Sequence, residues 1–265
     1  MTDTDSTETK STDTESSDTP LPLVAHLTEL RDRLMRAVLA VLAVLIALLA
    51  FSNDIYAFVS EPLRKLLPPG SSMIATDVGG TFFAPFKATV VTALMICIPY
   101  ILYQIWSFIA PGLYKKEKRL AVPLLLSSVL LFYAGMAFAY YAVFPVVFGF
   151  FSHIAPEGVS YTPDISKFLD MALKMLLAFG CTFEIPVATY LLVWSGITSV
   201  ASLTAKRPYV IVGCFIVGAL LSPPDVLSQT MMAIPMWLLF EAGVLASRLI
   251  KKSESDETES NFPAL

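Results

Sequence analysis

Long apolar runs separated by short polar segments dominate the chain between residues 35 and 247. A helix that crosses the hydrocarbon core of a bilayer needs about 20 predominantly apolar residues. The pattern predicts six such spans, of which the last two are short. They lie near 35–51, 88–110, 120–144, 168–194, 208–222 and 228–247. We therefore expect an all-α, polytopic membrane protein whose six-helix transmembrane domain covers residues 21–250.

Composition supports this class. Of 265 residues, 55% are hydrophobic and only 15% are charged, whereas soluble domains carry about 25% charged residues. Residues 1–20 and 251–265 are rich in acids and offer no apolar surface to bury, so we expect disordered, solvated tails. The first 20 residues also lack the apolar segment of a secretory signal peptide.

The distribution of cations predicts the orientation. An even number of spans places both termini on one side, and 13 of the 18 Lys and Arg residues fall in the termini and the connections of that side. Because Lys and Arg accumulate in cytoplasmic loops, we expect both termini in the cytoplasm and the protein in the plasma (inner) membrane. The longer connections, 52–87 and 145–167, then lie outside, and the first includes an amphipathic stretch at 54–67. The five outer cations are Arg64, Lys65, Lys87, Lys167 and Lys174.

A charged segment, HLTELRDRL at 26–34, precedes the first span. Glu29 with Arg33, and Asp32 with Arg36, stand at the i,i+4 spacing that stabilises a surface helix. On pattern alone this is an interfacial helix with its own salt bridges, or a segment that presents Glu29 to a ligand.

The connection FIAPGLYKKEKRL at 108–120 surrounds Glu117 with four cations. It is an orientation signal with an incidental glutamate, or part of a binding surface. Glu29 and Glu117 both project from the expected cytoplasmic side. Two carboxylates there suit an arginine-bearing ligand, because guanidinium binds carboxylate through two parallel hydrogen bonds.

Glu184 interrupts the apolar run AFGCTFEIPVATYLL at 178–192. A charged side chain at mid-bilayer costs roughly 2.5–3.5 kcal/mol on insertion scales, so Glu184 is either protonated or faces polar partners. Pro186 cannot donate a backbone hydrogen bond, which predicts a kink beside the acid. Glu184 either fixes packing within the bundle or has a function within the membrane.

No catalytic or metal motif accompanies these residues: the sequence has no HExxH, GxSxG or phosphate-binding glycine pattern. The three cysteines show no CxxC spacing, and the two histidines are expected on opposite sides of the membrane. We expect no cofactor, no metal and no enzymatic activity.

Several segments, in order along the chain, carry a resemblance to a known family: HLTELRDRL, FSNDIYAFVSEPL, MIATDV, YQIWSFIAPGLYKKEKR, LLFYAGMAFAYY, FEIPVA, KRPYVIVG and LLSPPDVLSQTMMAIPM. Together they resemble the TatC family, the receptor subunit of the twin-arginine protein translocase, over about residues 22–250. The resemblance implies binding of twin-arginine signal peptides of folded cargo and export driven by the proton-motive force. It also implies an oligomeric receptor complex with single-span TatA- and TatB-type partners, and no nucleic acid.

The resemblance also implies roles for particular residues. In the amino-terminal segment and the first cytoplasmic loop, the residues expected to bind the signal peptide are Glu29, Arg31, Phe108, Pro111, Leu113, Tyr114 and Glu117. Within the membrane, the residues expected to contact a partner helix as one polar cluster are Glu184, Ser222 and Gln229.

Without the resemblance, the residues favour a different function, a proton-coupled secondary transporter with Glu184 as proton relay. That alternative needs a second intramembrane acid or two halves related by a repeat. The sequence shows no such repeat, and Glu241 is the one further deep candidate.

Overall fold

The computed structural model describes residues 22–66, 73–77, 79–109, 118–153, 162–221 and 226–260. Within them the chain is helical, and the single β-contact is an isolated bridge between Ile74 and Asp164. The helices are α1 (Pro22–Leu48), α2 (Ser52–Leu66), α3 (Gly80–Ile109), α4 (Lys118–Phe138), α5 (Phe144–His153), α6 (Ile165–Thr182), α7 (Ile185–Trp194), α8 (Val200–Ala205), α9 (Arg207–Leu221) and α10 (Val226–Ser260). A 3-10 turn, Leu49–Phe51, joins α1 to α2, and a π-helical turn, Ala139–Val143, joins α4 to α5.

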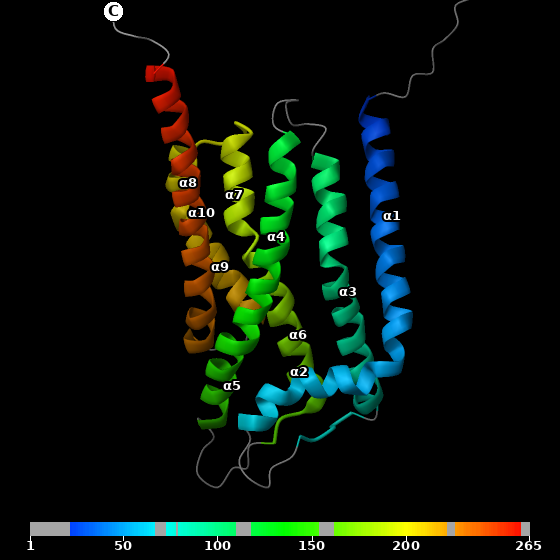
Figure 1. Cartoon of the computed structure of the whole chain (residues 1–265). Helices are drawn as coiled ribbons and strands as arrows, with labels where there is room; N and C mark the ends of the chain where they lie inside the picture. The colour runs from blue at the N-terminus through cyan, green and yellow to red at the C-terminus, as the bar shows by residue number, and fades with distance from the viewer. Residues whose placement is uncertain are drawn as a thin grey trace, which may run out of the picture.

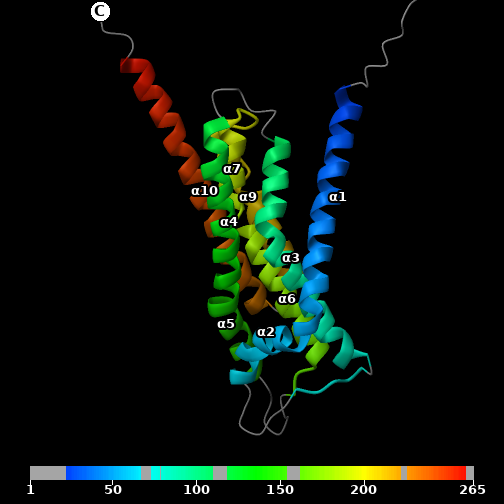
Figure 2. The ribbon, with the colours of Figure 1, turned by 45° about the vertical axis from the view of Figure 1, so that its right-hand side comes forward.

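Among the described residues, five helical segments are long and apolar enough to cross a membrane, and α9 is a shorter apolar helix of 15 residues. Figure 1 shows α1 beginning and α10 ending at one end of the bundle, which we call the terminal face. Helix α2 lies across the other end, which we call the opposite face. Towards the terminal face, α1 and α10 lean apart with α3, α4 and α7 between them (Figure 2).

The predicted spans agree with the helices at most boundaries, and the amphipathic stretch at 54–67 is α2. The first span extends back to Pro22 without a break, so the charged segment 26–34 is the beginning of α1 and not a separate helix. Helix α3 begins at Gly80, several residues before the predicted span. The end of α10, to Ser260, lies within the expected carboxy-terminal tail.

The expected connection at 145–167 is wrong over its first part, because the third span continues as α5 to His153. Pro145 has no N–H and would interrupt an α-helix at this point. The π-helical turn before it absorbs the irregularity, since the N–H of Phe144 bonds to the carbonyl of Ala139, one residue further back than in an α-helix.

Prolines inside the helices free carbonyl groups, and tyrosines of the third span bind them. Pro99 cannot donate to the carbonyl of Met95, and the Tyr133 hydroxyl donates to that oxygen at 3.0 Å. Pro62 likewise cannot donate a hydrogen bond to the carbonyl of Phe58, which accepts one from the Tyr140 hydroxyl at 2.9 Å. Because a backbone group without a partner is costly in a membrane, these bonds fix α4 to α3 and the π-helical turn to α2.

The largest buried side chains come mainly from the third span, α6 and α10, and include Phe144, Leu169, Met175, Phe179 and Met232. Elsewhere the helices approach through glycine. A methyl group on Gly135 of α4 would lie 2.5 Å from the carbonyl oxygen of Phe179 in α6. Small residues at helix crossings allow such close backbone contact in membrane proteins.

Candidate functional site

At the terminal face, α1 and the end of α3 form one surface. The His26 ring of α1 stacks on the Phe108 ring of α3 with centroids 4.2 Å apart. Two turns further along α1, the Arg33 guanidinium donates to the Gln104 side-chain oxygen at 3.5 Å. These contacts hold Glu29, which lies between His26 and Arg33 in sequence, beside the end of α3.

Glu29 is paired but still accessible. The Arg33 guanidinium donates to its Oε1 through Nε at 3.0 Å and through the terminal nitrogen at 2.5 Å. The Glu29 side chain is 39% exposed, whereas that of Arg33 is 19% exposed. Both bonds use the same carboxylate oxygen, and no described residue donates a hydrogen bond to Oε2.

The other predicted residues of this surface have different outcomes. Arg31 is exposed and pairs with Asp32 at 2.8 Å, so Asp32 does not form the i,i+4 pair with Arg36 that its spacing suggested. Pro111, Leu113, Tyr114 and Glu117 lie outside the described residues, as does Ser222. The flanking ends of α3 and α4 both lie at the terminal face (Figure 1).

Glu184 lies at the break between α6 and α7, where sequence reasoning predicted a kink. Its backbone caps the amino end of α7, and Pro186 occupies the first turn, where a missing N–H is tolerated. The side chain is half-buried, and its Oε1 atom is fully buried and has no hydrogen-bond partner among the described residues. A buried carboxylate oxygen without a partner is costly, and in this arrangement of the helices it is not open to a group from another molecule.

Ser128 of α4 lies beside the Glu184 carboxylate and accepts a hydrogen bond from the Trp106 indole of α3 at 3.4 Å. A small polar site thus joins α3, α4 and α7. Sequence reasoning missed Ser128 and Trp106, and the one signal for the serine was its place within the apolar run of the third span.

The expected polar cluster of Glu184 with Gln229 does not form. Helix α10 meets the start of α7 at Gly243, where an added methyl would lie 2.8 Å from the Cα atom of Pro186. Gln229 precedes Gly243 by almost four helical turns, about 21 Å along the axis. Its side-chain amide instead donates to the carbonyl of Phe215 in α9 at 2.8 Å.

Glu241, the second acid that a proton-relay transporter would need, is engaged in an ion pair. Its Oε2 accepts from the Arg207 guanidinium at 2.6 Å, which connects α10 to the start of α9. This contact gives no support to a relay running from Glu184 to Glu241.

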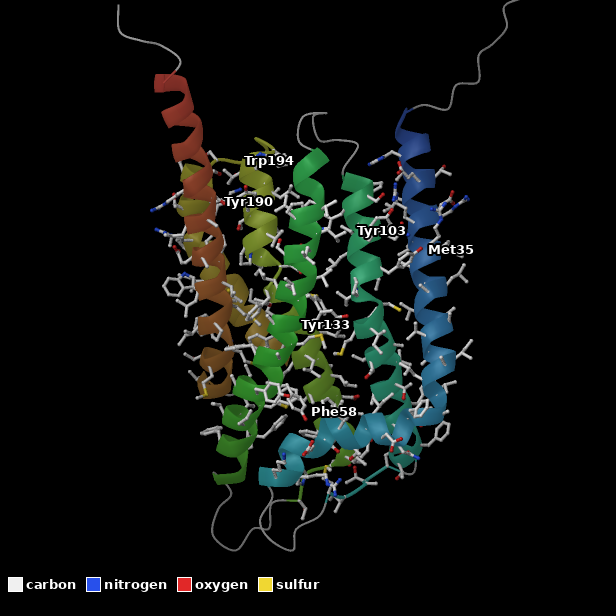
Figure 3. All side chains as sticks on the ribbon, in the orientation of Figure 1. Met35, Phe58, Tyr103, Tyr133, Tyr190 and Trp194 are labelled. Carbon is white, nitrogen blue, oxygen red and sulfur yellow. The ribbon has the colours of Figure 1, made fainter. Side chains whose placement is uncertain are left out.

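An apolar cavity of about 530 Å³ opens between α2, α3 and α4. Phe58 of α2 and Tyr133 of α4, labelled in Figure 3, contribute to its wall, as do Met95 and Tyr140. Its wall therefore includes both carbonyl–tyrosine contacts described above. Among the described residues, no group of three or more potential metal ligands occurs.

The fold and the polar sites define a multi-pass helical membrane protein with a paired acid at the terminal face and a half-buried acid within the bundle. Residues 25–235 match the family model described as Sec-independent protein translocase protein (TatC). A TatC protein of Azotobacter chroococcum mcd 1 is 59% identical over 234 residues, which is 88% of this chain and 92% of that protein. The TatC protein of Escherichia coli K12 is 56% identical over 227 residues, 86% of this chain and 88% of that protein.

A crystal structure described as the twin arginine translocase receptor TatC superposes with a TM-score of 0.76 at 35% identity, covering 84% of this chain and 98% of the other. A second, in DDM, gives 0.78 at 34% identity, with coverages of 84% and 99%. The chain belongs to the TatC family of protein translocase components.

Proposed function

We propose that this chain is the core receptor of a twin-arginine translocation system in the plasma (inner) membrane. It binds twin-arginine signal peptides of folded proteins at the terminal face, which is cytoplasmic in this proposal. With TatA- and TatB-type partners it exports them using the proton-motive force. Three observations support the proposal: family membership, the position of the start of α1 and the end of α10 at one end of the bundle, and the bias of Lys and Arg in the sequence towards the segments of that side.

The observation that carries the proposal is the accessible carboxylate of Glu29. Arg33 orients it through Oε1, and Oε2 is assigned to the ligand. An incoming arginine can bind Oε2 without displacing Arg33, because a carboxylate accepts about four hydrogen bonds. The stacked His26 and Phe108 rings beside it offer an apolar surface for the stem of the arginine side chain.

A single carboxylate binds a single guanidinium well, so recognition of two arginines needs a second acid. We assign that role to Glu117, the residue before α4 in sequence; the start of α4 lies at the same face. Arg31, Phe108 and the loop residues Pro111, Leu113 and Tyr114 complete the proposed surface. Lysine has one compact charged group and cannot form the forked pair, so a receptor of this kind discriminates arginine from lysine.

Glu184 is proposed to contact the transmembrane helix of a TatA- or TatB-type partner. Its half-buried carboxylate has one oxygen without a partner, next to Ser128. That oxygen is buried, so the neighbouring helices must shift before a polar group on a partner helix can bind it. Interhelical hydrogen bonds of this kind contribute about 0.6–2 kcal/mol in membranes. Glu184→Gln retains the shape, and we expect it to lower co-purification of partners without loss of the fold. Unchanged co-purification would count against this role.

The proposal is tested by export of a folded fluorescent reporter in cells whose sole TatC-family protein is this chain. We expect export of a reporter with an arginine pair in its signal peptide and none of a reporter with a lysine pair. Glu29→Gln should reduce export, whereas Glu61→Gln, which removes an acid on α2 at the opposite face, should not. Equal export of both reporters would refute the proposal.

A further inference from the structure

Three of the five outer cations belong to two neighbouring helices, α3 and α6. Lys87 of α3 donates to both carboxylate oxygens of Asp170 in α6, at 2.9 and 3.1 Å. Lys174 follows Asp170 by one helical turn, whereas Lys167 lines a separate pocket with Asp164 and Phe168. Two cations and one anion therefore meet at the α3–α6 contact, leaving a net positive charge.

Lys174 supplies that excess charge. Its side chain is exposed, and it forms no ion pair with a carboxylate of the described residues. Lys174 lies about 13 Å along α6 from its first residue. Side chains on a helix tilt towards its amino end, and both α3 and α6 begin near the opposite face (Figure 1). Lys87 and Lys174 therefore direct their ammonium groups towards the interface at that face, as lysines near helix ends do in membranes.

An apolar groove of about 360 Å³ extends from these cations along the same two helices. Besides Lys87, Asp170 and Lys174, its lining is apolar and consists of Phe86, Val90, Val91, Leu173 and Leu177. Val90 and Val91 lie about one turn deeper than Lys87, and Leu177 lies about one turn deeper than Lys174. The site thus presents positive charge near the interface and an apolar channel towards the bilayer centre.

We propose that this groove binds an anionic phospholipid of the leaflet at the opposite face. The phosphate lies against Lys174 and Lys87, and one acyl chain follows the groove along Val90 and Leu177. The site is complementary to an amphiphile with an anionic head, since a basic pocket between transmembrane helices suits a lipid head group. An ordinary apolar partner helix would leave the charge of Lys174 without a counter-ion.

The inference is tested on the purified full chain in detergent, with phosphatidylglycerol and phosphatidylcholine as probes and native mass spectrometry as the readout. We expect the chain to retain phosphatidylglycerol in preference, and Lys174→Gln to lower that affinity about fivefold, from about 1 kcal/mol per lysine near a membrane surface. Lys174→Gln breaks no ion pair of the fold. Lys65→Gln, on α2 of the same face but outside the groove, is the matched control and should leave retention unchanged. Equal retention by Lys174→Gln and wild type would overturn the proposal.

Two further arms identify the occupant. A photo-reactive residue in place of Phe86, which is exposed at the groove, should form an adduct of phospholipid mass in native membranes. An adduct with another protein would mean that the groove holds a partner helix and would refute the proposal. Thermal stabilisation by phosphatidylglycerol should exceed that by inorganic phosphate at equal concentration. Equal stabilisation would show a simple anion site without an acyl chain and would also refute it.

Discussion

Replacing Gly243 by alanine is expected to force α7 and α10 apart. The added methyl group would lie 2.1 Å from the Thr189 hydroxyl oxygen and 2.8 Å from the Cα atom of Pro186. Rotation of Thr189 would give up its hydrogen bonds to the carbonyls of Ile185 and Pro186, at 2.9 and 3.0 Å. The Pro186 atom belongs to the backbone and can move only with the helix. Overpacking typically costs 1–3 kcal/mol, and we expect the upper part of that range, about 2–3 kcal/mol, because a backbone atom must shift.

The free energy of unfolding in mixed micelles, measured by denaturant titration, tests this expectation. Gly213→Ala is the matched control, since a methyl group on that α9 residue meets no atom within 4 Å. We expect Gly213→Ala to be neutral or to stabilise by up to about 1 kcal/mol, because alanine is the better helix former. Adding Thr189→Ala to Gly243→Ala should recover part of the loss. Equal free energies of unfolding for Gly243→Ala and Gly213→Ala would contradict the close contact between α7 and α10 at Gly243.

Two other predictions concern polar contacts. Tyr133→Phe leaves the Met95 carbonyl without a partner, and we expect a loss of about 1–2 kcal/mol in the same titration, against no change for the exposed Tyr141→Phe. At the opposite face, hydrogen bonds, first of all that from the Thr76 hydroxyl, hold the pKa of Asp164 well below its usual range. A carboxyl group whose pKa is lower in the folded than in the unfolded state stabilises the fold. This contribution is complete above the unfolded pKa, about 3.9, and is lost as the pH falls through the folded pKa. Protection of the Thr76 amide from hydrogen exchange should therefore decline with acidification below pH 4 in the wild type, whereas Asp164→Asn should already be weakly protected at pH 7 and show little pH dependence.

The apolar pattern predicted most of the fold, because burial in lipid requires long apolar helices with internally satisfied backbones. The break at Glu184 was also predictable, since Pro186 removes a helical donor. The extent of α5 was not. Pro145 and Gly149 are typical of a connection, and only the π-helical turn before them allows the helix to continue.

In the candidate sites, too, contacts within one helix were predictable from the sequence and contacts between helices were not. The spacing of Glu29 and Arg33 predicted their ion pair because both belong to one helix. Contacts between helices depend on how the spans pack, and neither spacing nor hydropathy specifies this. The neighbours of Glu184 in space, Ser128 and Trp106, come from two other helices. The expected proximity of Glu184 and Gln229 failed for the same reason, because α10 meets α7 far from Gln229.

The central claim, that Glu29 accepts a guanidinium from the signal peptide, is tested by the affinity of the purified chain for two peptides. One carries the arginine pair, and in the other both arginines are glutamines. Hydrogen bonds to charged groups contribute about 1.5–3 kcal/mol, and we take the lower end because Glu29 is partly exposed and shared with Arg33. Glu29→Gln should therefore weaken binding of the arginine peptide about tenfold, with no effect on the glutamine peptide. Equal affinity of the unaltered chain for both peptides, or an equal loss for both with Glu29→Gln, would contradict the claim.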